Sequence, residues 1–199
     1  MIPTQTPARG QNLKRSTMTS ASDSKHGSPS EEAVRMWVLR AGKGGEAHDL
    51  FIAEQVIALA DENMGSLRSL ANTRTAFYQA FAFRNPHKEA VAIRGKGGKF
   101  FRFIHEVSVG DYVLYPSLRE GRHVYLGIVK SDYFYVPKLG PFSHRRRIRW
   151  ISSVRKAALS EFAQRELGGA RTFFRFKSHV GEIRRLFRRS PHTSAESSP

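Results

Sequence analysis

The chain has 199 residues, the length of one domain with short ends, and its 40% hydrophobic and 25% charged residues are typical of a globular protein. The sequence contains no cysteine, which excludes disulfides, thiolate zinc sites and cysteine nucleophiles. Lysine and arginine number 33 against 17 acidic residues. The net charge of +16 predicts a polyanionic partner, most often a nucleic acid, and the alternative is a solvated basic surface.

The two ends differ in composition from the middle. Residues 1–33 are polar and lack apolar periodicity, so we expect a disordered leader, and residues 190–199 predict a short disordered tail. The leader carries four basic and three acidic residues and the tail carries one acidic residue, so the positive charge belongs to a folded region over residues 34–189. No apolar run is long enough to span a membrane and none resembles a secretory signal. We therefore expect a soluble cytoplasmic protein with no membrane partner.

The first half of the folded region predicts short strands and helices in alternation. Period-2 and period-3.6 apolar patterns distinguish the two types of element. The patterns predict strands over 34–40 and 56–60 and helices over 47–54 and 73–83. Asn85 as N-cap and Pro86 at the first helical position predict a helix that ends near Gly95. The apolar spacing from Phe100 to Val107 predicts another helix over 98–107.

The second half is richer in strands. The runs over 111–116, 123–130 and 133–136 are separated by turn residues and predict an antiparallel meander. Further patterns predict strands over 145–150 and 172–176 and helices over 159–167 and 180–187. The fold class that follows is α+β, a mixed β-barrel with flanking helices.

Two glycine-rich segments carry the same GKGG motif, at 42–45 and 95–98. Backbone N–H groups of consecutive glycines can converge on a phosphate or on the polar edge of a base, and Lys43 and Lys96 would add positive charge. The alternative is a plain flexible turn. Neither segment fits the Walker A pattern, so we do not expect ATP binding.

The segment SHRRRIRW, at 143–150, is the densest cluster of arginines. On a strand, Arg145, Arg147 and Arg149 would lie on one face about 7 Å apart. We predict that these guanidinium groups bind phosphates, because arginine matches phosphate geometry. The alternative is a solubilising edge strand.

Aromatic residues are frequent around these segments. Most aromatic side chains of a small barrel belong to its core, but two or three can sandwich an extruded base. Catalytic patterns are poor: there is no HExxH motif, and the spacing of acid and lysine that metal-dependent nucleases use occurs only at Asp23-Ser24-Lys25, in the leader. We expect no enzyme activity, no catalytic residue, no bound metal and no cofactor.

Several segments, taken in order, are similar to one protein family. They are Trp37 to Gly42 with Gly45 and Phe51, Phe103 to Glu106, Gly110 to Val113, Val124 to Val129, Tyr133 to Tyr135, His144 to Arg146, and Arg149-Trp150. Together they resemble the N-terminal recognition domain of Mrr-like modification-dependent restriction enzymes, an EVE-like branch of the PUA-like superfamily that also includes YTH domains. The resemblance spans residues 34–189. It implies a PUA-like (EVE-like) β-barrel with a pocket that accepts a flipped, modified base of DNA.

The resemblance also assigns site residues. The loop after the first strand, Arg40-Ala41-Gly42-Lys43-Gly44, would border the base pocket, with Trp37, Tyr133 and Trp150 in or beside it. The phosphate-binding residues would be Lys43, Lys96, Arg145, Arg147 and Arg149. The family's VAIGW-like strand is replaced by VIALA at 56–60, without its glycine and tryptophan, so this wall of the pocket differs. The fused nuclease of the family does not occur in the folded region.

These observations predict a non-enzymatic DNA-binding module that recognises a modified base, above all a modified cytosine such as 5-methylcytosine, by base flipping in a restriction system. A separate nuclease subunit would then cleave the DNA. Three alternatives remain: an RNA-binding PUA-like module, a metal-dependent nuclease that uses acids such as Asp111 and Asp132, and a basic domain without a specific ligand.

Overall fold

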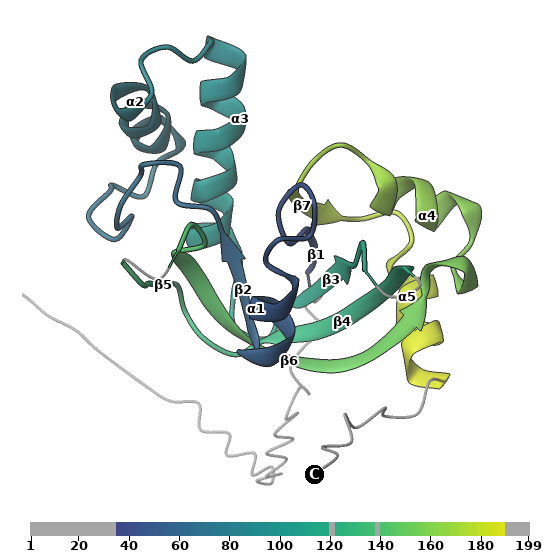
Figure 1. Cartoon of the computed structure of the whole chain (residues 1–199). Coiled ribbons are helices and arrows are strands. Elements are labelled where there is room, and N and C mark those ends of the chain that lie inside the picture. The colour runs from purple at the N-terminus through teal and green to yellow at the C-terminus, as the bar shows by residue number, and fades with distance from the viewer. Residues whose placement is uncertain (1–34, 120–121, 138–139, 190–199) are drawn as a thin grey trace, which may run out of the picture. The chain divides into compact units, whose positions relative to one another are not determined.

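The computed structural model describes residues 35–119, 122–137 and 140–189, all within the unit formed by residues 33–199 (Figure 1). The leader predicted over 1–33 and the tail predicted over 190–199 lie outside the described residues. The described part combines a curled, open half-barrel sheet with several helices, so the predicted α+β class is confirmed.

The sheet contains every strand of the described residues. The strands are β1 (Met36–Leu39), β2 (Val56–Leu59), β3 (Tyr112–Pro116), β4 (His123–Val129), β5 (Phe134–Tyr135), β6 (His144–Arg155) and β7 (Phe173–Phe176). Their order is β2-β6-β4-β3-β1-β7, and β5 pairs with β6. Only β1 and β3 run parallel; the other pairs are antiparallel. The main order ends at β2 and β7, so the sheet is open, and the short β5 is a further edge strand beside β6.

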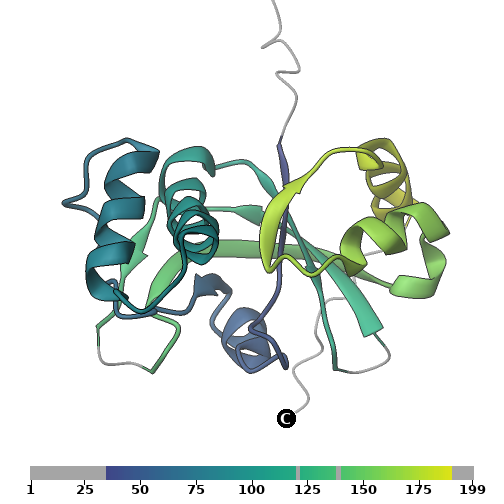
Figure 2. The ribbon, with the colours of Figure 1, turned by 90° about the horizontal axis from the view of Figure 1, so that it is seen from above.

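Helices and helical turns connect and flank the strands of the sheet. They are α1 (His48–Ala53), α2 (Arg74–Arg84), α3 (Ala90–Phe101), the π-helix η1 (Arg102–Glu106), the 3₁₀ turn η3 (Lys156–Ala158), α4 (Glu161–Gly168) and α5 (Val180–Arg189). In Figures 1 and 2, α2 and α3 stand together at one end, and α4 and α5 lie at the other. Thr73 and Ser160 cap α2 and α4, because their hydroxyls accept hydrogen bonds from Ala76 N (3.2 Å) and Ala163 N (3.3 Å).

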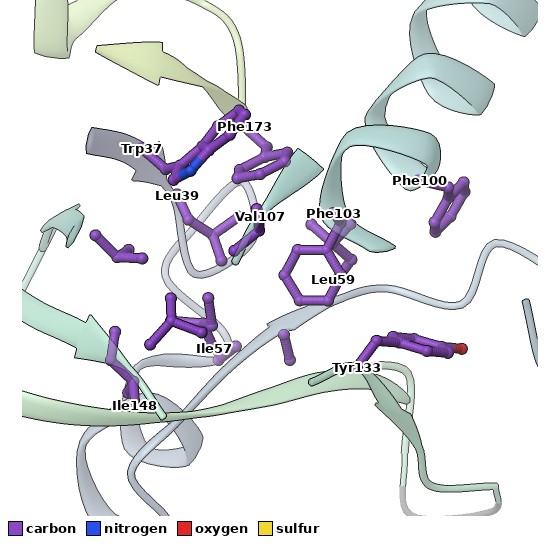
Figure 3. Packing of buried hydrophobic residues seen from close by; sticks show 14 of the residues in the cluster. Trp37, Leu39, Ile57, Leu59, Phe100, Phe103, Val107, Tyr133, Ile148 and Phe173 are labelled. Atoms are coloured by element: carbon purple, nitrogen blue, oxygen red, sulfur yellow. The ribbon is translucent and has the colours of Figure 1, made fainter. Parts of the chain in front are cut away.

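Alternation along β1 divides the core between two clusters. Trp37 and Leu39 point into the larger cluster, which β2, β6 and α3 complete, while Met36 and Val38 point into a second cluster with α4 and α5. Figure 3 shows the larger cluster, in which the Trp37 ring stacks on Phe173 with a centroid separation of 5.2 Å. All four residues of β1 are buried, so this strand is the shared wall of both clusters.

The second GKGG segment is helical, and its prediction as a loop is wrong. Residues 95–98 lie inside α3, which begins at Ala90 rather than at Pro86 and continues directly into η1. Asn85 is the C-cap of α2, not an N-cap. A Cβ on Gly97 would lie 2.8 Å from Tyr78 and 2.9 Å from the carbonyl oxygen of Phe77. The glycine therefore allows α3 to pack closely against α2, and this tertiary contact outweighs the low helix propensity of glycine.

The other predicted elements are confirmed with small shifts of their ends. The predicted helix over 98–107 is formed partly by α3 and partly by η1. The strand predicted over 145–150 is longer, because β6 bends through a bulge beside Leu126 and Gly127 and continues to Arg155. The predicted meander holds for β3 and β4, but β5 pairs with β6 and not with β4.

Candidate functional site

A cavity of about 350 Å³ lies where the loop after β1 meets the end of β2, α3 and the segment before β6. The loop contributes Arg40, Gly42 and Lys43, and α3 contributes Lys96 and Lys99. Its floor is apolar and consists of Ala58, Leu59 and Ala60, with Pro141 and Phe142 beside them. The fold thus brings both GKGG segments to one cavity, although only the first is a loop.

The first GKGG loop already holds an anion of its own. Gly42 has φ +83°, and a Cβ there would lie 1.9 Å from Glu46 Oε2. This carboxylate oxygen accepts a hydrogen bond from Gly44 N at 3.1 Å. Hydrogen bonds from the backbone of Glu46 and Gly44 lower the pKa of the Glu46 carboxyl group below its ordinary value. Because Glu46 accepts these backbone hydrogen bonds, the same N–H groups are not available to bind a phosphate. The group of this loop that a ligand can reach is the exposed Lys43 ammonium.

A carboxylate lies between two lysines in the cavity wall. Glu62 Oε1 accepts hydrogen bonds from Lys99 Nζ at 2.7 Å and from Lys96 Nζ at 3.0 Å. Burial alone would raise the pKa of Glu62, but the charges and hydrogen bonds of Lys99 and Lys96 outweigh it, so the pKa lies below the ordinary value. Burial lowers the pKa of Lys99, and Glu62 offsets part of that shift. The wall therefore presents an ionised carboxylate with two ammonium groups and carries net positive charge.

Among the described residues that line the cavity, Phe142 is the aromatic one. Its Cζ atom would lie 3.3 Å from a Cβ on Gly42, so glycine is needed where the loop passes the ring. Arg145 fixes this segment, because its Nε donates to Phe142 O at 2.9 Å and its Nη1 pairs with Glu54 Oε2 at 2.8 Å. Phe142, Lys99 and Glu62 were not predicted from the sequence as site residues. The sequence does contain a signal for Lys99: it lies three residues after Lys96, and on a continuous helix this spacing places both lysines on one face.

Arg40 closes the end of a neighbouring helix. Its Nη2 donates to the carbonyl oxygens of Leu167 (3.0 Å) and Gly169 (2.6 Å), at the C-terminus of α4. Its Nε atom is buried and has no hydrogen-bond partner among the described residues. Arg40 thus borders the cavity as predicted by the resemblance, but much of its guanidinium group is engaged within the fold. Ala41 is buried in the core.

The three predicted pocket aromatics lie outside this cavity. Trp37 Nε1 donates to Asp111 Oδ2 at 2.9 Å, and Trp150 Nε1 donates to Phe51 O at 2.7 Å. The Tyr133 hydroxyl accepts from Leu67 N at 3.2 Å and is hydrogen-bonded to His144 Nδ1 at 2.9 Å. Trp37 and Tyr133 are buried and Trp150 is half-buried. Each polar atom of these rings is satisfied internally, and the rings support the sheet.

The predicted row of phosphate-binding arginines is reduced to two exposed members, Arg147 and Arg149. Arg145 is buried in its contacts with Glu54 and Phe142 O, as described above. Arg147 lies over the Phe134 ring, with its guanidinium carbon 5.8 Å from the ring centroid. The alternation of β6 was thus predicted correctly, but tertiary contacts occupy its first arginine.

Arg146 points to the other face and holds the π-helix in place. It donates to Phe103 O (2.8 Å), Ile104 O (2.9 Å) and Ser131 O (3.0 Å), although only 1% of the residue is exposed. Burial lowers the pKa of its guanidinium group to about 10. The arginine compensates for η1, whose irregular turn presents backbone carbonyls that need donors.

Within the described ranges, no group of three or more histidine, aspartate or glutamate side chains is arranged to hold a metal ion. Asp111 accepts hydrogen bonds from Trp37 Nε1 and from Ser108 N (2.9 Å) and is paired with Arg35. No helix of the described part combines the length and the apolar character needed to cross a membrane.

Comparison with known proteins gives a family and a structural likeness. The family model described as "Domain of unknown function (DUF8426)" matches residues 37–177. No curated protein matches the sequence. Among solved structures, the chain is similar to the YTH domain of the Zygosaccharomyces rouxii MRB1 protein, determined in complex with N6-methyladenosine RNA. The likeness has 10% sequence identity and a TM-score of 0.44, and it covers 81% of this chain and 92% of that one.

Proposed function

The chain belongs to the DUF8426 family, and we propose that it is a nucleic-acid-binding module that receives one modified base of DNA in the cavity between the β1–α1 loop, β2 and α3. The cavity carries this proposal: an apolar floor, one aromatic ring and a cationic rim meet in a space of about 350 Å³. Mainly apolar cavities of about this size with a few polar groups are typical of small-molecule binding sites. The net charge of +16 favours a polyanion as the molecule that delivers the ligand.

The groups in the cavity suit a cytosine. Phe142 offers a face for stacking, which is worth about 1 to 3 kcal/mol per base. The ionised Glu62 carboxylate is an acceptor for an exocyclic amino group, as acidic side chains are for cytosine N4. Ala58 and Ala60 give apolar contact to a methyl group at the 5-position. These features favour 5-methylcytosine, extruded from its stack, as the ligand.

Two further parts of the proposal rest on the sequence resemblance. It implies a PUA-like, EVE-like fold and an association with modification-dependent restriction. We propose accordingly that the module is not an enzyme and that a separate nuclease subunit supplies cleavage.

Fluorescence anisotropy with matched oligonucleotides tests this function. The set contains plain cytosine, 5-methylcytosine, 5-hydroxymethylcytosine or N6-methyladenine in DNA, and one RNA copy. We expect a preference of about tenfold for a modified cytosine, equivalent to about 1.4 kcal/mol. Equal and steeply salt-dependent binding to every oligonucleotide would refute base recognition, and a requirement for 2′-hydroxyls would assign the module to RNA.

A matched pair of variants locates the preference. F142A removes the aromatic ring of the cavity, whereas W150F removes an indole N–H that the cavity does not use. We expect F142A to abolish most of the preference for the modified base and W150F to leave it unchanged. If W150F abolished the preference and F142A left it unchanged, the base pocket would instead lie at the aromatic residues of the sheet.

A further inference from the structure

A second cavity adjoins the proposed base pocket. It has a volume of about 420 Å³ and lies between α3 and the segment that precedes β7. The two cavities share Lys43, Lys96, Lys99 and Thr172 as lining residues, so they lie side by side. We call the second cavity the α3–β7 groove.

Every charged residue in the described lining of the α3–β7 groove is cationic. Arg102 and Arg171 extend the three shared lysines, and no aspartate or glutamate is among the described residues that line it. The base pocket differs in this respect, because Glu46 and Glu62 contribute to its lining. The groove is therefore suited to a ligand that carries several negative charges along its length.

Arg102 lacks a full set of partners inside the protein. Its Nε atom is buried without a hydrogen-bond partner among the described residues. Burial lowers the pKa of its guanidinium group; Glu106 opposes this shift, and the positive charges of Arg74 and Arg171 add to it. Glu106 is itself paired with Arg74. An anion in the groove would offset the repulsion between these arginines and accept hydrogen bonds from the outer nitrogens of the Arg102 guanidinium group.

The second arginine is positioned from the other side. Arg171 is exposed, and its guanidinium carbon lies 4.9 Å from the centroid of the Phe174 ring. This stacking restricts the side chain without taking up its N–H donors. The groove thus has two guanidinium groups on opposite sides: the half-buried one of Arg102, where α3 continues into η1, and the exposed one of Arg171, just before β7.

We propose that the α3–β7 groove binds the phosphates of the nucleic-acid strand that flank the base held in the neighbouring cavity. The inference rests on the proposed function for the identity of the ligand, and it moves the phosphate path from β6 to α3. Arg147 and Arg149 are exposed on β6 but line neither the base pocket nor the groove among the described residues.

Two double variants of equal charge test the proposal. R102Q/R171Q and R147Q/R149Q each remove two positive charges, the first pair from the groove and the second from β6. For single strands each lost phosphate contact lowers the slope of log K against log salt by about 0.7, which is about fivefold in affinity at 0.1 M salt. We therefore expect R102Q/R171Q to weaken binding of a 5-methylcytosine single strand about 25-fold and R147Q/R149Q to weaken it less than about threefold.

The results separate this inference from the proposed function. Equal losses of affinity in the two double variants would refute the proposal that the α3–β7 groove binds the phosphates. A 25-fold loss confined to R102Q/R171Q, in a protein that shows no preference among bases, would support the groove and refute base recognition. Thermal unfolding monitors folding of each variant. If R102Q/R171Q does not fold, the exposed single variant R171Q decides the matter, since it should lose about fivefold in affinity and R149Q should not.

Discussion

Gly95 and Gly97 both lie inside α3, but only Gly97 packs against α2, so alanine substitutions at the two positions distinguish the effect of helix propensity from that of packing. A Cβ at Gly95 would meet no atom within 4 Å, whereas a Cβ at Gly97 would lie 2.8 Å from Tyr78 and 2.9 Å from Phe77 O. Alanine is more favourable than glycine in a helix interior by about 1 kcal/mol, so G95A should stabilise the protein by about that amount. G97A gains the same propensity but overpacks the helix contact, which costs about 1 to 3 kcal/mol, and a backbone oxygen cannot yield by changing rotamer.

We expect G95A and G97A to differ by about 2 kcal/mol in the free energy of unfolding, with G97A below the parent protein. For a chain of this size the difference corresponds to about 4 to 8 °C in Tm. Thermal unfolding followed by far-ultraviolet circular dichroism measures it directly. G98A is the control, because its Cβ would make only ordinary contacts, at 3.5 Å or more. Equal stabilisation by G95A and G97A would refute the close approach of α3 to α2, and destabilisation by G95A would contradict the helical conformation of this motif.

Three further perturbations test the buried polar groups and the first loop. R146K keeps the charge but loses about two of three charge-assisted hydrogen bonds, so urea unfolding should show a loss of about 3 kcal/mol; a loss below about 1 kcal/mol would contradict the role given to Arg146. G42A should lower the urea midpoint, because alanine is strained at the φ of +83° and its Cβ would displace the Glu46 carboxylate from Gly44 N, whereas G44A, at 3.4 Å from Glu46, should change it little. The pKa of Glu62 is depressed in the folded state, so its carboxylate stabilises the fold above the ordinary value of 4.5 and loses this effect as pH falls through the folded pKa. The stability advantage of the parent protein over E62Q should therefore shrink from pH 7 to pH 3, and a constant difference would contradict the ion pair with the two lysines.

The strands could be predicted from sequence because each carries a local apolar pattern. In β1 and β7 nearly every residue is apolar and buried, and runs as short and as rich in aromatic residues as Met36 to Leu39 and Phe173 to Phe176 are typical of buried strands. The direction and pairing of these strands carry no such local signal. The parallel pairing of β1 with β3 and the pairing of β5 with β6 depend on contacts between distant segments.

The continuous helix α3 could not be predicted, because its evidence lies outside its own sequence. Three glycines within Gly95 to Gly98 indicate a turn when only propensity is considered. What favours the helix is the contact of Gly97 with α2, an interaction between two segments. A loop over 95–98 would not place Lys96 and Lys99 on one helix face, so Lys99 was not predicted as a site residue.

The arginines of β6 explain why a count of positive charges overestimates the binding surface. Arg145 holds the backbone of Phe142, and Arg146 holds the carbonyls of η1 at the end of α3. Both side chains are buried, and neither can meet a ligand without leaving a backbone acceptor unpaired. Their contribution to binding is therefore positional. Arg145 fixes the backbone of Phe142 beside the proposed base pocket, and Arg146 fixes the end of the helix from which Lys96 and Lys99 reach the cavity. These two arginines therefore support a site whose positive charges come from α3 and from Lys43 of the first loop.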